Sequence, residues 1–131
     1  MRIIHPIARI LLGVIFFVLG LNGFHPFIPA PLPPPGPALQ FFMAMATAHY
    51  LWFTSGVQVI CGLMLLTNRY VPLAIVTLAA VLANVLVYHL TMQLNTLPIA
   101  LFTILLWFIV AWPLRAYFSP LLVDKVTLPS R

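Results

Sequence analysis

The sequence has almost no acidic residues, because Asp124 is the only Asp or Glu among its 131 residues. Charged side chains make up 5% of the chain, whereas soluble domains carry roughly 25%, so the composition excludes a water-soluble globule. A proton relay or ion pathway built on buried carboxylates has no residues to use. The single cysteine, Cys61, cannot form a disulfide within the chain.

Hydrophobic residues make up 63% of the chain, which is enough for about four spans of about 20 residues each. No Lys, Arg, Asp or Glu occurs from residue 10 to 68 or from residue 70 to 114. We therefore predict an all-α membrane protein whose single domain, residues 1–131, is a four-transmembrane-helix bundle. The predicted spans cover residues 6–24, 51–67, 71–91 and 98–116. A tail, residues 117–131, follows the last span.

The segment between the first two spans is rich in proline, with seven prolines in the thirteen residues from His25 to Pro37. Such a run favours extended polyproline geometry over helix. It must lie in water or against protein, because unpaired backbone is not tolerated facing lipid. The apolar stretch Ala38–Tyr50 is too short to cross a bilayer, so it predicts a short interfacial helix that leads into the second span.

All six Lys and Arg residues fall on one side of a four-span topology: Arg2, Arg9, Arg69, Arg115, Lys125 and Arg131. Basic residues are enriched on the cytoplasmic side of membrane proteins. The pattern therefore predicts that both termini are cytoplasmic (N-in/C-in), in a bacterial cytoplasmic or inner membrane. Six dispersed charges do not form the clustered patch that binds nucleic acid.

Neutral polar side chains lie inside the predicted spans. The tight turn between the second and third spans makes them antiparallel neighbours, which places Gln58 level with Asn84 and Thr54 level with Tyr88 near the outer surface. One interpretation is a structural layer of interhelical hydrogen bonds formed by these four residues. The alternative uses Gln58, Asn84, Tyr88 and His89 to bind the polar end of a lipophilic ligand such as a quinone.

Histidine and methionine gather at the predicted outer end, and imidazole and thioether ligands suit copper. The candidate ligands are His25, Met43, Met45, His49, His89 and Met92. Their spacing includes no tight cluster, and an amphipathic interfacial segment accounts for the same residues. We therefore predict no metal site. The sequence also contains no catalytic constellation, and it requires no cofactor, although a quinone is compatible with it.

The stretch GLMLLTNRYVPLAIVTLAAVLANVLVYHL, residues 62–90, resembles the signature of the DoxX-like family of small integral membrane proteins. The segment RILLGVIFFVLGLNGF and the proline-rich loop after it fit the same family. The resemblance implies a four-helix membrane fold and a link, in some members, to quinone-dependent sulfur oxidation and terminal oxidases. The residues that match the family pattern are Asn22, Arg69, Pro72, Asn84 and His89.

The chain departs from the family pattern at positions where members often carry acidic residues. Gln58 and Trp107 stand at these positions, and Ala80 stands where members have a proline. The resemblance implies that losing both acids removes the groups that would carry proton-coupled chemistry. The chain would then keep the fold as a scaffold.

These observations favour a non-catalytic accessory or structural subunit of a larger redox or energy-converting membrane complex, or a self-assembling bundle. The first alternative is a redox subunit that binds a quinone or another lipophilic small molecule. The second is transport of a small solute by an oligomer. The expected partners are the lipid bilayer and either other membrane subunits or further copies of the chain.

Overall fold

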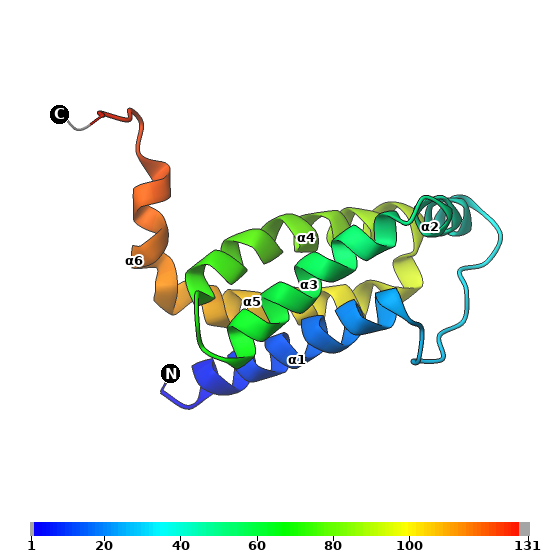
Figure 1. Cartoon of the computed structure of the whole chain (residues 1–131), viewed down its shortest axis with the longest axis horizontal. Coiled ribbons are helices and arrows are strands. Elements are labelled where there is room, and N and C mark those ends of the chain that lie inside the picture. The colour runs from blue at the N-terminus through cyan, green and yellow to red at the C-terminus, as the bar shows by residue number, and fades with distance from the viewer. Residues whose placement is uncertain (1, 129–131) are drawn as a thin grey trace.

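The computed structural model describes residues 2–128, which contain helices and no β-strand. This confirms the predicted all-α fold. The long helices run side by side as a bundle (Figure 1): α1 (Ile4–Phe24), α3 (Tyr50–Leu66), α4 (Val71–Met92) and α5 (Leu97–Ala111). The shorter helices are α2 (Pro37–Thr47), η1 (Leu94–Thr96), η2 (Trp112–Leu114), α6 (Arg115–Phe118) and η3 (Ser119–Leu122).

Three helical stretches within residues 2–128 are long and apolar enough to cross a bilayer: Ile4–Phe24, Val71–Met92 and Leu94–Leu122. A fourth arises if α2 and α3, which meet at 85°, are counted together. Helix α3 alone has 17 residues, which is near the lower limit for a span. Several long apolar helices of this kind fit a protein that is integral to a membrane.

Proline sets where several helices begin and where α5 ends. Pro37, Pro72 and Pro98 lie in the first turns of α2, α4 and α5, where a missing N–H costs nothing. The predicted fourth span, 98–116, is divided in the structure, because α5 ends at Ala111. Pro113 has no N–H for the next helical bond and its ring obstructs the preceding turn. The chain after it turns away from the bundle (Figure 1).

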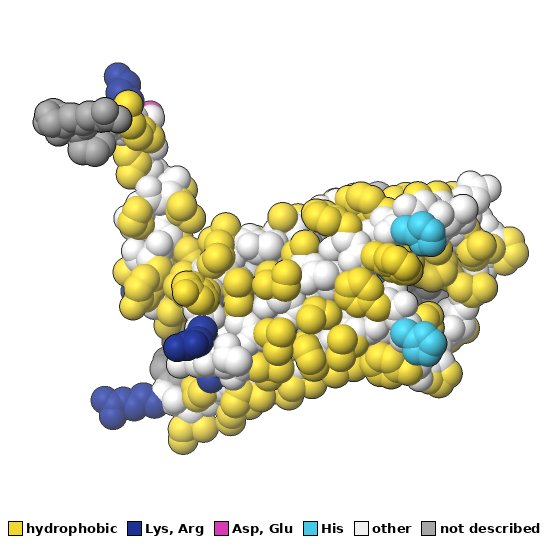
Figure 2. Space-filling model, viewed as in Figure 1, with side chains coloured by type: hydrophobic (Ala, Val, Ile, Leu, Met, Phe, Trp, Pro, Cys, Tyr) yellow, Lys and Arg dark blue, Asp and Glu magenta, His cyan; other side chains and the backbone are white. Residues whose placement is uncertain are grey.

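The basic residues mark one end of the bundle. Arg2 precedes α1, Arg69 lies in the turn between α3 and α4, and Arg115 and Lys125 follow α5. Figure 2 shows Lys and Arg side chains at the end that carries the N-terminus. We call this the basic end, and the opposite end, where α1 and α4 finish, the far end. Arg131 lies outside the described residues.

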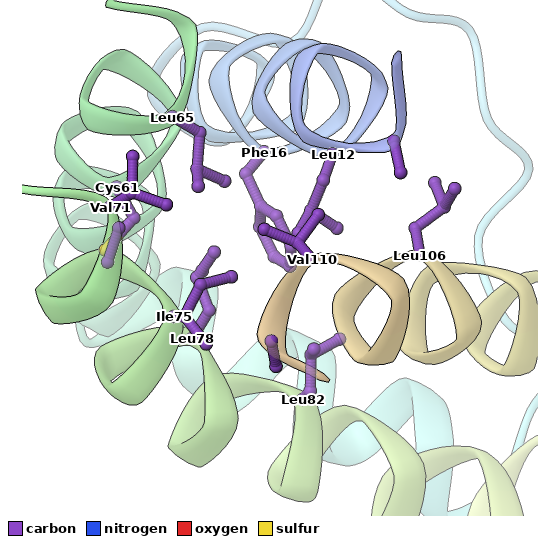
Figure 3. Close-up of a cluster of buried hydrophobic side chains, with 13 residues drawn as sticks. Leu12, Phe16, Cys61, Leu65, Val71, Ile75, Leu78, Leu82, Leu106 and Val110 are labelled. Carbon is purple, nitrogen blue, oxygen red and sulfur yellow. The ribbon is translucent and has the colours of Figure 1, made fainter. Parts of the chain in front are cut away.

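The hydrophobic core lies in the half of the bundle nearer the basic end. Figure 3 shows side chains from α1, α3, α4 and α5 meeting there, and the largest of those with no exposed surface are Leu12, Leu65, Ile75, Leu78 and Val110. Helices α1 and α3 approach closely at Gly62, where an added Cβ would lie 2.6 Å from the backbone nitrogen of Phe17. Small residues permit such close contact between apolar helices.

Two polar side chains are tied to backbone carbonyls in this half. Arg9 donates a hydrogen bond from Nη1 to the carbonyl oxygen of Leu65. Leu65 lies in the last turn of α3, so this bond joins α1 to the end of α3. Trp107 donates from Nε1 to the carbonyl oxygen of Ile75 at 2.9 Å, which joins α5 to α4.

Candidate functional site

A cavity of about 180 Å³ lies between α1, α3, α4 and α5, in the half of the bundle nearer the far end. Leu19 and Ile99 at its edge are 48% and 67% exposed, so the cavity reaches the surface of the bundle between α1 and α5. The residues that line it are Ile15, Phe16, Leu19, Gln58, Leu82, Val85, His89, Ile99, Ala100 and Thr103. The wall is therefore apolar apart from three polar side chains, one each from α3, α4 and α5.

His89 is oriented by residues that follow α4. Its Nδ1 lies 2.8 Å from Thr96 Oγ1, and Thr96 Oγ1 lies 3.1 Å from the carbonyl oxygen of Gln93. Both contacts are hydrogen bonds if Nδ1 carries the proton, because the imidazole then donates to the hydroxyl and the hydroxyl donates to the carbonyl. In that tautomer Nε2 is a hydrogen-bond acceptor.

The end of α4 forms a polar cluster around Gln93. Tyr88 donates a hydrogen bond from its hydroxyl to Gln93 Oε1 at 2.8 Å, and its ring meets the His89 ring edge-on at 5.2 Å. The ring of Phe41, on α2, lies 5.9 Å from that of Tyr88. Helix α2 is thus held against the far end of the bundle, beside the cluster that orients His89.

Gln58 and Thr103 differ in how their polar groups are used. Thr103 donates its hydroxyl to the carbonyl oxygen of Ile99 on its own helix at 3.0 Å. The amide of Gln58 makes no hydrogen bond to any residue between positions 2 and 128. Gln58 therefore presents an amide with both donor and acceptor capacity to an apolar cavity.

The structure does not bring Gln58 and Asn84 together. Asn84 is exposed, and its Nδ2 donates to the carbonyl oxygen of Ala80, one turn earlier in α4, at 2.9 Å. The cavity face of α4 carries Leu82 and His89. At about 100° per residue, Asn84 lies about 200° around the helix from Leu82. Asn84 therefore lies on the outer face of α4, away from Gln58.

The other members of the predicted layer are also satisfied within their own segments. Thr54 donates to the carbonyl oxygen of Leu51 at 3.0 Å, and Tyr88 bonds to Gln93 rather than to Thr54. Local bonds of this kind are available to any helical Thr or Asn. Gln93 and Thr96 were missed at the sequence level, although their position within seven residues of His89 is a usable signal.

Two of the candidate copper ligands, His49 and His89, are in contact with other side chains. Among residues 2–128, no three His, Cys, Asp or Glu side chains lie close enough to share a metal ion. The ring of His49 packs against Trp52 with centroids 4.9 Å apart, and His89 is bound to Thr96.

Asn22, a residue of the family resemblance, accepts backbone hydrogen bonds from Phe27 and Ile28 and so shapes the loop after α1.

Comparisons with known proteins give no match, whether with family models, curated proteins or solved structures. What the cavity can bind therefore follows from its own residues. Its walls suit an apolar ring, and the polar groups of Gln58 and His89 suit oxygen atoms on that ring. The only acid of the chain, Asp124, lies after η3, so no carboxylate faces the cavity.

Proposed function

We propose that this protein is a four-span membrane protein that binds a lipophilic molecule with a polar ring, of the quinone class. The single observation that supports this function most is the cavity. It has an apolar wall in which Gln58 and His89, from two different helices, present polar groups that the rest of the bundle leaves free. Pockets for small molecules commonly combine apolar walls with a few convergent polar groups.

The size of the cavity favours one ring. An apolar cavity of about 150 Å³ in another protein holds benzene, and this cavity measures about 180 Å³. A larger ligand would not fit inside, so an attached isoprenoid or alkyl tail would leave between Leu19 and Ile99. That exit faces the surface which a membrane-spanning bundle presents to lipid, where such a tail is soluble.

The polar groups fit the two redox states of a quinone. The Gln58 amide can donate to a quinone carbonyl, and Nε2 of His89 can accept from the hydroxyl of the reduced form. No second titratable side chain lines the cavity, so binding and positioning suit the site better than turnover does. The resemblance to the DoxX-like family agrees with this class and stays a prediction.

Binding can be tested on purified protein. Extraction of the protein from its native membrane in mild detergent, followed by mass spectrometry of the bound lipids, should recover a quinone. Titration with decylubiquinone should then show saturable binding that weakens about tenfold in Gln58→Leu and in His89→Phe, since each loses about one hydrogen bond to the ring. Thr91→Val is a matched control, because Thr91 is exposed on α4 and bonds only to Val87. Equal affinities for decylubiquinone in the wild type, the two cavity variants and the control would refute binding in this cavity.

The orientation that we propose is N-in/C-in, in a bacterial cytoplasmic membrane. Four basic residues at one end of the bundle support it, because Lys and Arg favour the cytoplasmic side. The loops at the far end, residues 25–36 and 93–96, carry no Lys or Arg. A reporter fused to the C-terminus should be active only as a cytoplasmic reporter, and activity of a periplasmic reporter there would reverse the orientation.

A second candidate function, an accessory subunit or self-assembling bundle, is favoured by Asn84. Its amide is exposed on α4 between Ala80 and Val87, and only Nδ2 has a partner. An amide on a lipid-facing helix gains by bonding to another helix. Asn84→Leu should therefore shift the protein to a smaller assembly on a native gel, whereas Thr91→Val should not. Unchanged migration of Asn84→Leu would remove this support.

A further inference from the structure

The chain after α5 forms an arm, residues 112–128, which leaves the basic end of the bundle sideways (Figure 1). Leu114 and Phe118, four residues apart, pack against the hydrophobic core and hold the start of the arm to the bundle. Every residue from Ser119 to Leu128 is exposed. The arm is therefore attached at its base and uncovered along most of its length.

The exposed part of the arm is largely apolar, and apolar surface is unfavourable in water. Leu122, Val126 and Leu128 are 85%, 84% and 86% exposed, and Leu121 is 66% exposed. Burying aliphatic surface is favourable in proportion to its area. A contiguous exposed apolar surface marks a contact with a membrane or another molecule. We therefore expect the arm to contact a partner of one of these kinds.

The charges at the basic end indicate which kind of molecule contacts the arm. Arg115 and Lys125 belong to the arm, as does Asp124, the only acid in the chain, and Arg2 and Arg69 lie at the same end of the bundle. The basic residues of the arm and of this end therefore outnumber the acid by four to one. A complementary partner is both apolar and anionic. The cytoplasmic surface of a bilayer that contains anionic phospholipid has both properties.

The base of the arm has the residues of a membrane interface. Trp112 and Tyr117 are 62% and 67% exposed, and aromatic residues of this type concentrate at the head-group level. The guanidinium of Arg115 lies 5.5 Å from the centre of the Trp112 ring and donates to the Trp112 carbonyl at 3.3 Å. An Arg side chain held there can extend its charge to a phosphate while its stem stays in apolar surroundings.

We infer that residues 112–128 are a surface anchor that binds the anionic phospholipid head groups of the leaflet at the basic end. The inference rests on the four-span transmembrane placement proposed above, since a spanning bundle brings a sideways arm into the plane of the membrane surface. Pro113 ends α5 at that level. Arg115 and Lys125 then face phosphate groups, while Leu122 and its apolar neighbours enter the upper acyl region.

Spin labelling of the full-length chain tests the anchor. In a Cys61→Ala background, a nitroxide at Leu122→Cys is compared for its accessibility to oxygen and to a water-soluble nickel chelate. The protein is reconstituted in nanodiscs of phosphatidylcholine alone or of phosphatidylcholine mixed with anionic phosphatidylglycerol. We expect the ratio of oxygen to nickel accessibility to rise several-fold when phosphatidylglycerol is present, and R115Q/K125Q to abolish the rise.

Two further labels separate the anchor from the proposed transmembrane placement. Val76→Cys, exposed on α4, should report the hydrocarbon core in both lipids, and Thr67→Cys, exposed near the turn at the basic end, should report water. An aqueous Leu122 label beside a lipid-buried Val76 label overturns the anchor alone. Equal burial of Leu122 in both lipids, or spin–spin broadening between copies, also overturns it. An aqueous Val76 label overturns the transmembrane placement and the anchor together.

Discussion

The interior of the bundle near the basic end is filled by side chains, and the hollow at that end is an open apolar depression on the surface, lined by Ile4, Phe108, Ile109 and Trp112. The half near the far end instead contains a cavity between the four helices, which opens to the surface. In the first half, Leu12, Ile75 and Val110 have no exposed surface, and Gly62 lets two backbones touch. In the second half, Gln58 and His89 line a space of about 180 Å³. The contrast teaches that the same four helices can form a filled core in one half and a cavity with polar side chains in its wall in the other.

The largest expected effect comes from one substitution made in both halves. Ala74 is 0% exposed in the core, and Ala100 is also buried, at 2% exposed, but lines the cavity. Ala74→Leu has no room for three extra carbons, so we expect it to lower the free energy of unfolding by about 3 kcal/mol, and Ala100→Leu by less than about 1 kcal/mol. Unfolding by SDS titration in mixed micelles measures both. Equal losses would show that the halves are packed alike.

A smaller effect is expected at the contact between α1 and α3. Gly62→Ala places a Cβ against the backbone of Phe17 and should cost about 2 kcal/mol, because a backbone cannot give way as a flexible side chain can. Gly56→Ala is the control in the far half, since its Cβ would meet only the ring of Phe24, at 3.8 Å. The same unfolding measurement should separate the two variants. A Gly62→Ala protein as stable as the control would contradict the close packing.

The smallest effect is expected from the bond between α5 and α4. Trp107→Phe removes the donor to the Ile75 carbonyl and should lower the free energy of unfolding by about 0.6 kcal/mol, an average value for hydrogen bonds between membrane helices. Trp112→Phe is the matched control, because that ring is 62% exposed. An identical loss in both variants would indicate that the Trp107 bond contributes nothing.

The apolar runs and prolines were enough to predict helices close to those observed. The end of α5 at Ala111 was harder, since a proline inside a predicted span can kink a helix or end it. The relative depth of residues on α3 and α4, which the turn between these helices suggests, stays a prediction. The cavity could not be predicted, since the face of α4 that turns inward depends on packing, which places His89 inside and Asn84 outside.

The most direct test of the cavity as a binding site is a titration of wild-type protein and Ala100→Leu with decylubiquinone in nanodiscs. Leucine at this position fills the space without removing a polar group. We expect saturable one-to-one binding by the wild type and affinity at least about tenfold weaker in Ala100→Leu, equivalent to about 1.4 kcal/mol, with the helical content unchanged. Equal binding by both proteins, or no saturable binding by the wild type, would contradict a ligand site in the cavity.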